Sequence, residues 1–551
     1  GDDCDVVDAP PTLAPISSNP DELTQRLNDL IGLLTPLSGA AVFQDTSSPQ
    51  YSAASWMASD DPAMVDFATT SFDLIKERYV VTLLYYATNG ASWNNERNFL
   101  TASTVCQWGG ILCDPNTLLI TGFNLPRNNL DGTLPTELGS VSGCSRITMQ
   151  VNELKGNLPT ELGELTLMTE LDLSDNLLNG NIPSEIGAFT DLANLELQEN
   201  AFGGEIPSEL GMLTVLEDID FTGNLLSGPI PSEVGAMTNL YSLGFGQNRL
   251  SGQIPPEVAA ISTMEFMGLE SNELSGTIPL GFAILESLEE LLLFGNENLG
   301  GTIPPEWGNM PALVELDLSR TGVDGPIPSE FGFIDTLEII NFSFCGSMSG
   351  PLPTELGNLA GLEELLLSGN DFGGQLPTDI GRLNNLRRLE VADNALGGSI
   401  PTEFGGLINL EVLLLNDNPG MTGALPSELA FCAELQELNL RDTGVSGPFP
   451  SEIGNLPNLV KIYVEGTGLT GNLDPLACTD QYEFINANCD GLDIECNCCS
   501  VCCDANGRNC GPGTQGHGLL WSARLSNSCY SLLYSQGRWK LKLIVQLYGT
   551  K

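Results

Sequence analysis

The chain has 551 residues, of which 71 are acidic and 20 are basic, and its formal net charge is −51. Such a surface repels nucleic acids and anionic membranes, and it favours cations or basic partners. Hydrophobic residues make up 42% of the chain, which excludes an acidic disordered polypeptide. The sequence contains no run of about 18 apolar residues, so no membrane span is predicted.

Helices are predicted ahead of a cysteine motif in the first 119 residues. Residues 1–60 are expected to form a mobile segment with a short amphipathic helix at 21–34. Residues 61–119 are expected to form a helical cap, whose helix at 72–87 covers the segment that follows. The cap ends in the motif CxWxGxxC, with Cys106, Trp108, Gly110 and Cys113 at its fixed positions.

Residues 120–474 repeat with a period of 24 residues. The stretch MTELDLSDNLLNGNIPSEIGAF aligns with LANLELQENAFGGEIPSELGML, and fifteen turns share the frame LxxLxLxxNxLxGxIPxxLGxLxx. The leucines of LxL point inward from a short strand, and because one turn cannot close a core, neighbouring turns must stack. The pattern predicts a right-handed α/β solenoid of about 15 repeats with a parallel sheet on its concave face.

Two kinds of residue at fixed positions are predicted to lie inside the solenoid. An asparagine column is expected to satisfy backbone groups at the bend of each turn, where an unpaired group is costly. It comprises Asn128, Asn152, Asn176, Asn200, Asn224, Asn248 and Asn272. Cys144, Cys345 and Cys432 also fall on core positions, and we interpret them as small buried hydrophobic residues.

The repeated frame is the leucine-rich repeat signature, and its LxGxIP half resembles the plant-type extracellular subclass. The stretch SPQYSAASWMASDDP at 48–62, with the helix and cap motif after it, resembles secreted or receptor-like repeat proteins of diatom-type algae. The resemblance implies a disulfide between Cys106 and Cys113 in an N-terminal cap. It also implies a secreted or cell-surface protein with a role in signalling, inhibition or adhesion.

A cysteine-rich segment at 475–512 follows the repeats. Its eight cysteines are Cys478, Cys489, Cys496, Cys498, Cys499, Cys502, Cys503 and Cys510. An even number of cysteines at the end of a solenoid favours a disulfide cap, although C-x-C and C-x-x-C spacings also permit a zinc or redox site. Residues 513–551 contain no acidic residue, and this basic tail is expected to form a strand or to lie on the acidic body.

An acidic surface is predicted on the concave face, where positions 2, 3, 5, 7 and 8 of each turn point outward. Position 5 places Asp172, Glu196 and Asp220 on consecutive strands about 4.8 Å apart, with Glu170 and Asp218 beside them. Like charges stacked in this way repel. Either this is a solvated face, or a cation such as calcium or a basic peptide binds there.

An apolar surface is predicted farther along the same face, and exposed groups of this kind mark partner sites. Its members are Tyr241, Phe266, Leu292, Phe294, Phe344, Leu366 and Leu414. Asn341 lies on the same face within the N-x-S/T sequence Asn-Phe-Ser, and it is a predicted glycosylation site.

These features favour extracellular recognition of a protein, peptide or glycan on the concave face. The alternative is a structural or adhesive matrix protein whose acidic surface is bridged by calcium or polycations. No enzyme activity or cofactor is expected, because the concave carboxylates look alike and exposed and the one histidine, His517, lies in the tail.

Overall fold

The computed structural model describes residues 19–472. Beyond them it describes only the backbone of β32 (Phe484–Asn488), β33 (Ile494–Glu495), β34 (Val501–Cys503), β35 (Gly511–Pro512), β36 (Tyr530–Tyr534) and β37 (Trp539–Leu543). No helix in these described parts is long and apolar enough to cross a bilayer.

Three helices form the N-terminal cap: α1 (Pro20–Ser38), α2 (Pro49–Ser59) and α3 (Phe72–Ala87). Proline stands at the start of α1 and α2, where the missing N–H costs nothing, and the Asn19 and Ser48 side chains accept bonds from the first turns. The helix predicted at 72–87 is confirmed, and Glu77 within it accepts a bond of 2.8 Å from the Ile120 amide of the first repeat.

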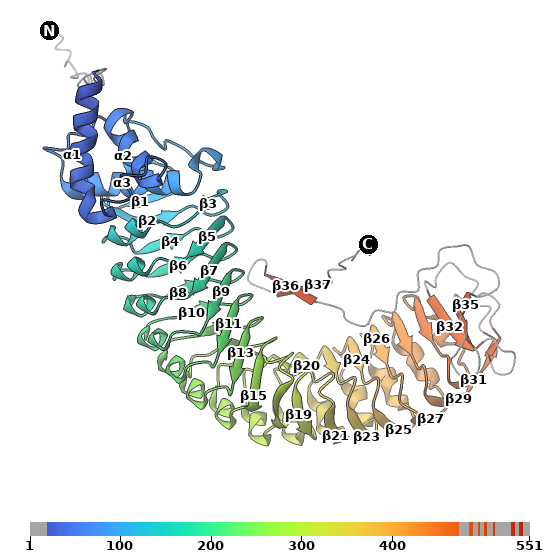
Figure 1. Ribbon diagram of the computed structural model, residues 1–551. Coiled ribbons are helices and arrows are strands. Elements are labelled where there is room, and N and C mark those ends of the chain that lie inside the picture. The colour runs from blue at the N-terminus through green and yellow to red at the C-terminus, as the bar shows by residue number, and fades with distance from the viewer. Residues whose placement is uncertain are drawn as a thin grey trace, which may run out of the picture.

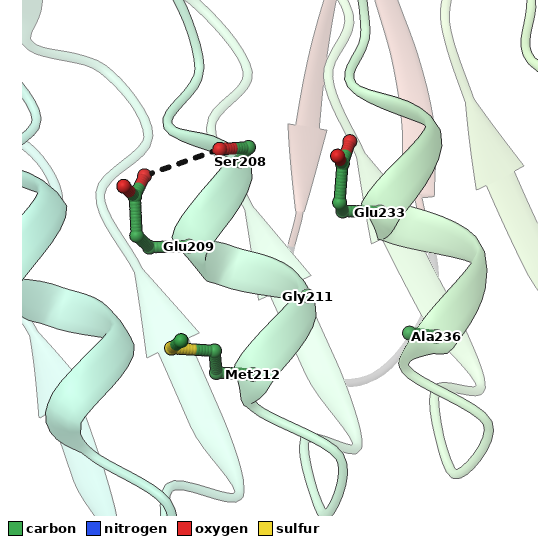
Figure 2. A pocket seen from close by; sticks show the side chains of 6 residues that line it. All are labelled: Ser208, Glu209, Gly211, Met212, Glu233 and Ala236. Atoms are coloured by element: carbon green, nitrogen blue, oxygen red, sulfur yellow. Dashed lines mark hydrogen bonds between the residues drawn. The ribbon is translucent and has the colours of Figure 1, made fainter.

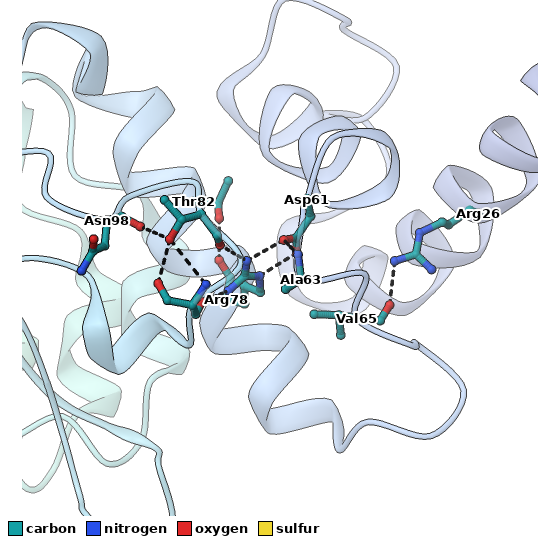
Figure 3. Close-up of polar contacts among 9 residues, drawn as sticks. Arg26, Asp61, Ala63, Val65, Arg78, Thr82 and Asn98 are labelled. Carbon is teal, nitrogen blue, oxygen red and sulfur yellow. Dashed lines mark hydrogen bonds and ion pairs between the residues drawn. The ribbon is translucent and has the colours of Figure 1, made fainter. Parts of the chain in front are cut away.

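The predicted division of the first 119 residues at residue 60 is wrong. α1 and α2 belong to the same apolar core as α3, and the indole of Trp56 in α2 packs edge-on against Trp108 of the cysteine motif, 6.2 Å between ring centroids. The Arg26 side chain of α1 donates to the Ala58 carbonyl. It also donates to the Val65 carbonyl (Figure 3). The sequence does not indicate this packing, because α2 has little helical periodicity and most of its buried side chains are alanines.

A buried ion pair joins two parts of the cap (Figure 3). The guanidinium of Arg78 donates to both oxygens of Asp61, at 2.6 and 2.7 Å, and also to the carbonyls of Thr101 and Ser103. Arg78 is 5% exposed and Asp61 is 2% exposed. The pair therefore ties α3 to the loop after α2 and to the segment that precedes the cysteine motif.

The repeats build two parallel sheets. In the yellow and orange part of Figure 1, β20, β24 and β26 lie along the inner side of the arc, and β21, β23 and β25 lie along the outer side. The inner, concave sheet has 19 strands among the described residues. They are β1 (Ile111–Cys113), β2 (Ile120–Asn124), β4 (Arg146–Thr148), β6 (Glu170–Asp172), β8 (Asn194–Glu196), β10 (Asp218–Asp220), β12 (Ser242–Gly244), β14 (Phe266–Gly268), β16 (Glu290–Leu292), β18 (Glu315–Asp317), β20 (Ile339–Asn341), β22 (Glu364–Leu366), β24 (Arg388–Glu390), β26 (Val412–Leu414), β28 (Glu437–Asn439), β30 (Lys461–Tyr463), β32, β34 and β35.

The second sheet comes from the LxGxIP half of each turn. Its strands are β3 (Asp131–Gly132), β5 (Glu153–Asn157), β7 (Leu177–Asn181), β9 (Ala201–Gly204), β11 (Leu225–Gly228), β13 (Arg249–Gly252), β15 (Glu273–Thr277), β17 (Asn298–Thr302), β19 (Gly322–Gly325), β21 (Ser347–Pro351), β23 (Asp371–Gln375), β25 (Ala395–Gly398), β27 (Gly420–Gly423), β29 (Gly444–Pro448), β31 (Gly468–Asn472) and β33. The leucines and isoleucines between the two sheets form one core along the whole stack.

A short 3₁₀ helix closes each turn after its proline. These helices are η3 (Thr136–Ser140), η4 (Thr160–Glu164), η5 (Ser184–Ala188), η6 (Ser208–Met212), η7 (Ser232–Ala236), η8 (Pro256–Ala260), η9 (Leu280–Ile284), η10 (Pro305–Asn309), η11 (Ser329–Phe333), η12 (Thr354–Asn358), η13 (Thr378–Arg382), η14 (Thr402–Gly406), η15 (Ser427–Phe431) and η16 (Ile453–Asn455), after η1 (Gly90–Ser92) and η2 (Val105–Gln107) in the cap. Most carry an acidic residue in the first turn, to which the preceding Ser or Thr hydroxyl often donates, as Ser184 does to Glu185.

The asparagine column joins each turn to the one before it, as the sequence predicts. The Asn248 amide donates to the Phe221 carbonyl of the preceding turn at 2.9 Å, and its oxygen accepts from the Leu226 amide at 2.9 Å. The same pattern repeats from Asn176 to Asn296. Thr321 and Cys345 then occupy the position, and each donates to the Leu318 carbonyl. Cys144, Cys345 and Cys432 are free and buried, as predicted.

Replacing Asn224 with alanine is expected to lower the free energy of unfolding by about 2–3 kcal/mol. The Asn224 side chain makes three buried hydrogen bonds of 3.0 Å, to the Phe202 amide and to the Leu197 and Phe221 carbonyls. Alanine leaves these backbone groups without that partner. Urea denaturation followed by circular dichroism measures the loss. Asn239→Ala is the control, since its amide makes one exposed bond to Thr214, and it should cost less than about 1 kcal/mol. Equal losses in the two variants would contradict the buried role of the column.

The parallel sheet continues past the predicted end of the solenoid at residue 474. β32 pairs in parallel with β30, β34 pairs with β32, and β35 turns back antiparallel to β34. The segment at 475–512 therefore adds strands to the concave sheet. The predicted disulfides of Cys478, Cys489, Cys496, Cys498, Cys499 and Cys510 lie outside the described residues, as do the side chains of Cys502 and Cys503.

Candidate functional site

Carboxylates line the concave face from β6 to β18. Asp172, Glu196 and Asp220 stand side by side, because β6, β8 and β10 pair in register through these residues. We define the acidic strip as Asp172, Glu196, Asp218, Asp220, Glu270, Glu290, Glu315 and Asp317. Its last four members were not predicted, because they occupy positions 3, 5 and 7 of later turns rather than one continuous row.

The predicted exposure of these carboxylates is wrong. Asp172, Glu196 and Asp220 are half-buried, and each accepts a bond from a residue two positions later in its own turn: Ser174, Gln198 and Thr222. Burial raises the pKa of Glu196 to about 7 and that of Asp220 to about 6, and their acidic neighbours add to both shifts. The carboxylates therefore differ in environment, although position 5 presents them alike in the sequence.

Glu270 is the most buried member of the acidic strip. It is 4% exposed, and its Oε2 has no hydrogen-bond partner in the described structure. Burial raises its pKa to about 7, and repulsion from Asp220 and Asp317 adds to the shift. Glu315 behaves similarly, with a pKa raised to about 7 by burial and by repulsion from Glu290 and Asp317.

Basic partners are missing along the acidic strip and present on either side of it. Among residues 19–472, no ion pair involves any of its eight members, whereas predicted Glu170 pairs with Arg146 at 2.9 Å. Beyond β20 the concave carboxylates again have partners. Lys461 pairs with Glu437 at 3.1 Å, and Arg388 pairs with Glu390. The acidic strip is therefore a continuous stretch of carboxylates without ion pairs among the described residues.

The predicted apolar residues divide into exposed and covered ones. Tyr241 is 39% exposed and Phe344 is 54% exposed, and the Arg320 guanidinium lies 5.4 Å from the Phe344 ring centroid. Phe266, Phe294, Leu366 and Leu414 are half-buried. Leu292 is 8% exposed, so the expectation that it is exposed is wrong.

Asn341 occupies the concave face as predicted, and its amide is engaged. Its Nδ2 donates to Asp317 at 2.9 Å, and its oxygen accepts from the Ser343 amide. Glycosylation of Asn341 stays a prediction.

Two shallow hollows lie on different faces of the repeats. One lies between η6 and η7, lined by Ser208, Glu209, Met212 and Glu233 (Figure 2). The same pairing of 3₁₀ helices recurs along the stack, so this hollow is a feature of the repeat. The other surrounds Tyr241 and is lined by Glu217, Asn239, Thr263, Glu265 and Ser287, which place carboxylates on both sides of the phenol.

A metal centre is not assembled in the described part of the chain. Among those residues, no group of three or more His, Cys, Asp or Glu side chains converges in a way that could hold a metal ion. Calcium was one alternative for Asp172, Glu196 and Asp220, but neighbouring strands hold these carboxylates in a row rather than around one point.

Comparisons with known proteins agree with this architecture. The Leucine Rich Repeat family model matches residues 168–189, 361–383, 385–407 and 434–456. The fold is a leucine-rich repeat solenoid. No curated protein matches the chain in sequence. The resemblance to repeat proteins of diatom-type algae is not borne out by any of these matches.

Solved leucine-rich repeat structures resemble the chain. The plant peptide hormone receptor RGFR1 in complex with RGF2 is 28% identical, with a TM-score of 0.62 over 70% of this chain and 68% of that one. PEPR1 with AtPEP1 is 29% identical, with a TM-score of 0.62 over 70% of this chain and 58% of that one. The ectodomain of the plant membrane receptor kinase GASSHO1/SCHENGEN3 from Arabidopsis thaliana, with CASPARIAN STRIP INTEGRITY FACTOR 2, is 26% identical, with a TM-score of 0.57.

These neighbours are larger than the matched region. The match covers 71% of this chain and 55% of the GASSHO1/SCHENGEN3 chain, so the leucine-rich repeat solenoid corresponds to little more than half of the second and third neighbours. The comparisons support a ligand-binding repeat module in general terms.

In the N-terminal cap of this module, Cys106 and Cys113 form a disulfide with their Sγ atoms 2.11 Å apart.

Proposed function

We propose that the chain is an extracellular recognition module that binds an extended peptide along its concave face. The observation that supports this most directly is the acidic strip without basic partners, which runs beside the aromatic side chains of Tyr241, Phe266 and Phe294. Partly buried carboxylates are costly to keep ionised without a partner, so a ligand that supplies positive charge gains affinity there. The disulfide in the cap fits an oxidising, extracellular compartment.

A peptide suits this face better than a glycan does. A peptide carries basic and apolar side chains together, which matches a surface where carboxylates and aromatic rings alternate along the turns. A neutral glycan would stack on the rings and leave the carboxylates uncompensated. The solved neighbours include a plant peptide hormone receptor in complex with RGF2, which agrees with peptide recognition by a solenoid of this kind.

A display library of random linear peptides, selected on the full chain, tests the proposal. We expect selected peptides whose affinity falls about 10-fold or more in Tyr241→Ala or Phe344→Ala, since both side chains are exposed on the concave face. Phe333→Ala is the matched control, because Phe333 is 70% exposed at the end of η11, outside the concave sheet. Isothermal titration calorimetry with synthetic peptides gives the affinities. Selected peptides that bind all three variants equally well would place recognition elsewhere.

A further inference from the structure

Three glycines create a gap in the row of concave side chains next to Glu270. Gly244 and Gly268 occupy position 5 of β12 and β14, and Gly246 occupies position 7 of the same turn as Gly244. A Cβ atom on Gly246 would lie 2.0 Å from Glu270 Oε1, and one on Gly244 would lie 2.7 Å from Asp220 Oδ1. The carboxylates of Glu270 and Asp220 therefore approach the glycine backbone from opposite sides. They occupy space that a side chain at Gly244 or Gly246 would fill. We call Gly244, Gly246 and Gly268 the glycine gap.

The Glu270 side chain reaches this gap, where it accepts a hydrogen bond from the Gln247 side chain. It belongs to the turn after Gly246, and the Gln247 amide donates to its carbonyl at 2.7 Å, which fixes the neighbouring strands in register. Its Oε2 is buried without a hydrogen-bond partner. An acceptor of this kind costs roughly 1–3 kcal/mol when it stays unpaired, and such positions are commonly kept for a ligand. Glutamine or leucine would be easier to bury in the same place.

An aromatic ring shares the gap with Glu270. A Cβ atom on Gly268 would lie 2.9 Å from Phe266 Cζ and 3.1 Å from Glu270 Oε2, so the ring and the carboxylate oxygen meet over the same glycine. Phe294 follows Glu270 on the next turn, where its carbonyl accepts from the Ser271 amide. A carboxylate beside an aromatic face is the combination that holds a guanidinium or ammonium group, through an ion pair and a cation–π contact.

We propose that the glycine gap is the subsite for one arginine or lysine side chain of the bound peptide, held between Glu270 and the Phe266 ring. The proposal rests on the peptide recognition proposed above and adds the chemistry of one ligand residue. Asp220 supplies a second negative charge at the edge of the gap. Binding requires the half-buried ring of Phe266 to rotate away from Gly268, which uncovers Oε2 and leaves the ring beside the cation.

An organic cation fits the gap better than a metal ion. A metal needs several ligands converging on one point, and the described residues form no such group. One carboxylate, a nearby second one and a ring give a site of low ligand number with an apolar wall, which suits a delocalised guanidinium.

A double-mutant cycle on selected peptides tests the subsite. Each arginine or lysine of a selected synthetic peptide is replaced with glutamine, and each peptide is titrated into wild type and Glu270→Gln by calorimetry. Replacing one particular basic residue should lower the affinity of the peptide for wild type about 10- to 100-fold. The unchanged peptide should lose a similar factor in affinity for Glu270→Gln. The peptide change and Glu270→Gln together should lower the affinity no more than either change alone, because both remove the same contact. Glutamine keeps the shape of Glu270 and needs no charge, so this variant is expected to fold.

The control is Glu273→Gln, an exposed carboxylate on β15 outside the concave sheet, which should change the affinity less than about 3-fold. Additive losses for every basic residue of the peptide against Glu270→Gln would overturn the subsite, as would selected peptides without any arginine or lysine. In both cases the loss of binding in Tyr241→Ala would still support peptide recognition. If no peptide is selected on the chain, the proposed function itself fails.

Discussion

Thermal unfolding is expected to move to higher temperature as the pH falls from about 8 to about 5. Burial raises the pKa of five glutamates to about 7, namely Glu77, Glu196, Glu270, Glu315 and Glu465, and it raises that of Asp220 to about 6. Their ordinary values of 4.5 and 3.8 apply to the unfolded chain. Between about pH 4.5 and pH 7 the folded protein therefore binds more protons than the unfolded chain does, so the free energy of unfolding falls as the pH rises.

The carboxylates with lowered pKa values do not reverse this trend. Asp45, Asp66 and Asp114 accept local hydrogen bonds that lower their pKa values from 3.8, so their contribution is lost only under more acidic conditions. Lower net charge on acidification also reduces self-repulsion in a chain with a formal charge of −51. Differential scanning calorimetry across this pH range measures the combined effect, and an unchanged or falling unfolding temperature on acidification would refute it.

Glu270→Gln separates the contribution of one buried carboxylate to the pH dependence of stability from the contribution of the overall net charge. A pKa raised from 4.5 to about 7 corresponds to roughly 3 kcal/mol, so the variant should be up to about 3 kcal/mol more stable than wild type near pH 8. Well below pH 4.5 the two proteins should converge, because Glu270 is then protonated in both the folded and the unfolded state. Glu273→Gln, which removes one exposed charge instead, should stay within about 1 kcal/mol of wild type near pH 8. Parallel curves for wild type and Glu270→Gln would show that Glu270 is ionised at little cost.

Asp61→Ala is expected to lower the free energy of unfolding by about 3–5 kcal/mol. The change leaves the Arg78 guanidinium 5% exposed without its carboxylate, between the rings of Trp56 and Trp108, whose centroids lie 5.5 and 4.9 Å away. The carbonyls of Thr101 and Ser103 still accept from Arg78, but they carry no full charge. Chemical denaturation followed by tryptophan fluorescence reports on the cap, because both indoles lie beside the guanidinium.

Asp73→Ala is the matched control for the cap. Asp73 pairs with Lys76 at 3.1 Å on the same helix, but its side chain is 62% exposed, so the loss should stay below about 1 kcal/mol. Similar losses in the two variants would mean that the Arg78–Asp61 pair stabilises no more than a surface pair does.

The repeat architecture could be predicted from the sequence because one constraint recurs in every turn. Each LxL pair must be buried, each asparagine must satisfy the bend, and fifteen repetitions leave one arrangement. The stacking of Asp172, Glu196 and Asp220 followed from the same frame, because a period of 24 residues with register pairing puts equal positions side by side. The helix at 72–87 was also predicted, and the structure confirms it.

The features that the sequence did not predict depend on contacts between different positions. Glu270 stands at position 7, and only the absence of side chains at Gly246 and Gly268 lets its carboxylate bend over the preceding turn. Leu292 belongs to an outward-facing position and is nevertheless buried. α2 joins the cap through Trp56 and a run of alanines, which carries no periodic signal. In each case the environment is set by the shape of adjacent residues, which a repeat frame treats as interchangeable.

The asparagine column has a consequence for how the protein is made. The amide of Leu226 donates to the Asn248 side chain of the next turn, and the amide of Leu250 donates to Asn272, so each turn gains hydrogen bonds from the turn synthesised after it. The α3 helix, which emerges before the repeats, already offers Glu77 to the amide of Ile120. The turns of a nascent chain can therefore fold in order from the N-terminal cap, and each new turn completes hydrogen bonds of the turn before it.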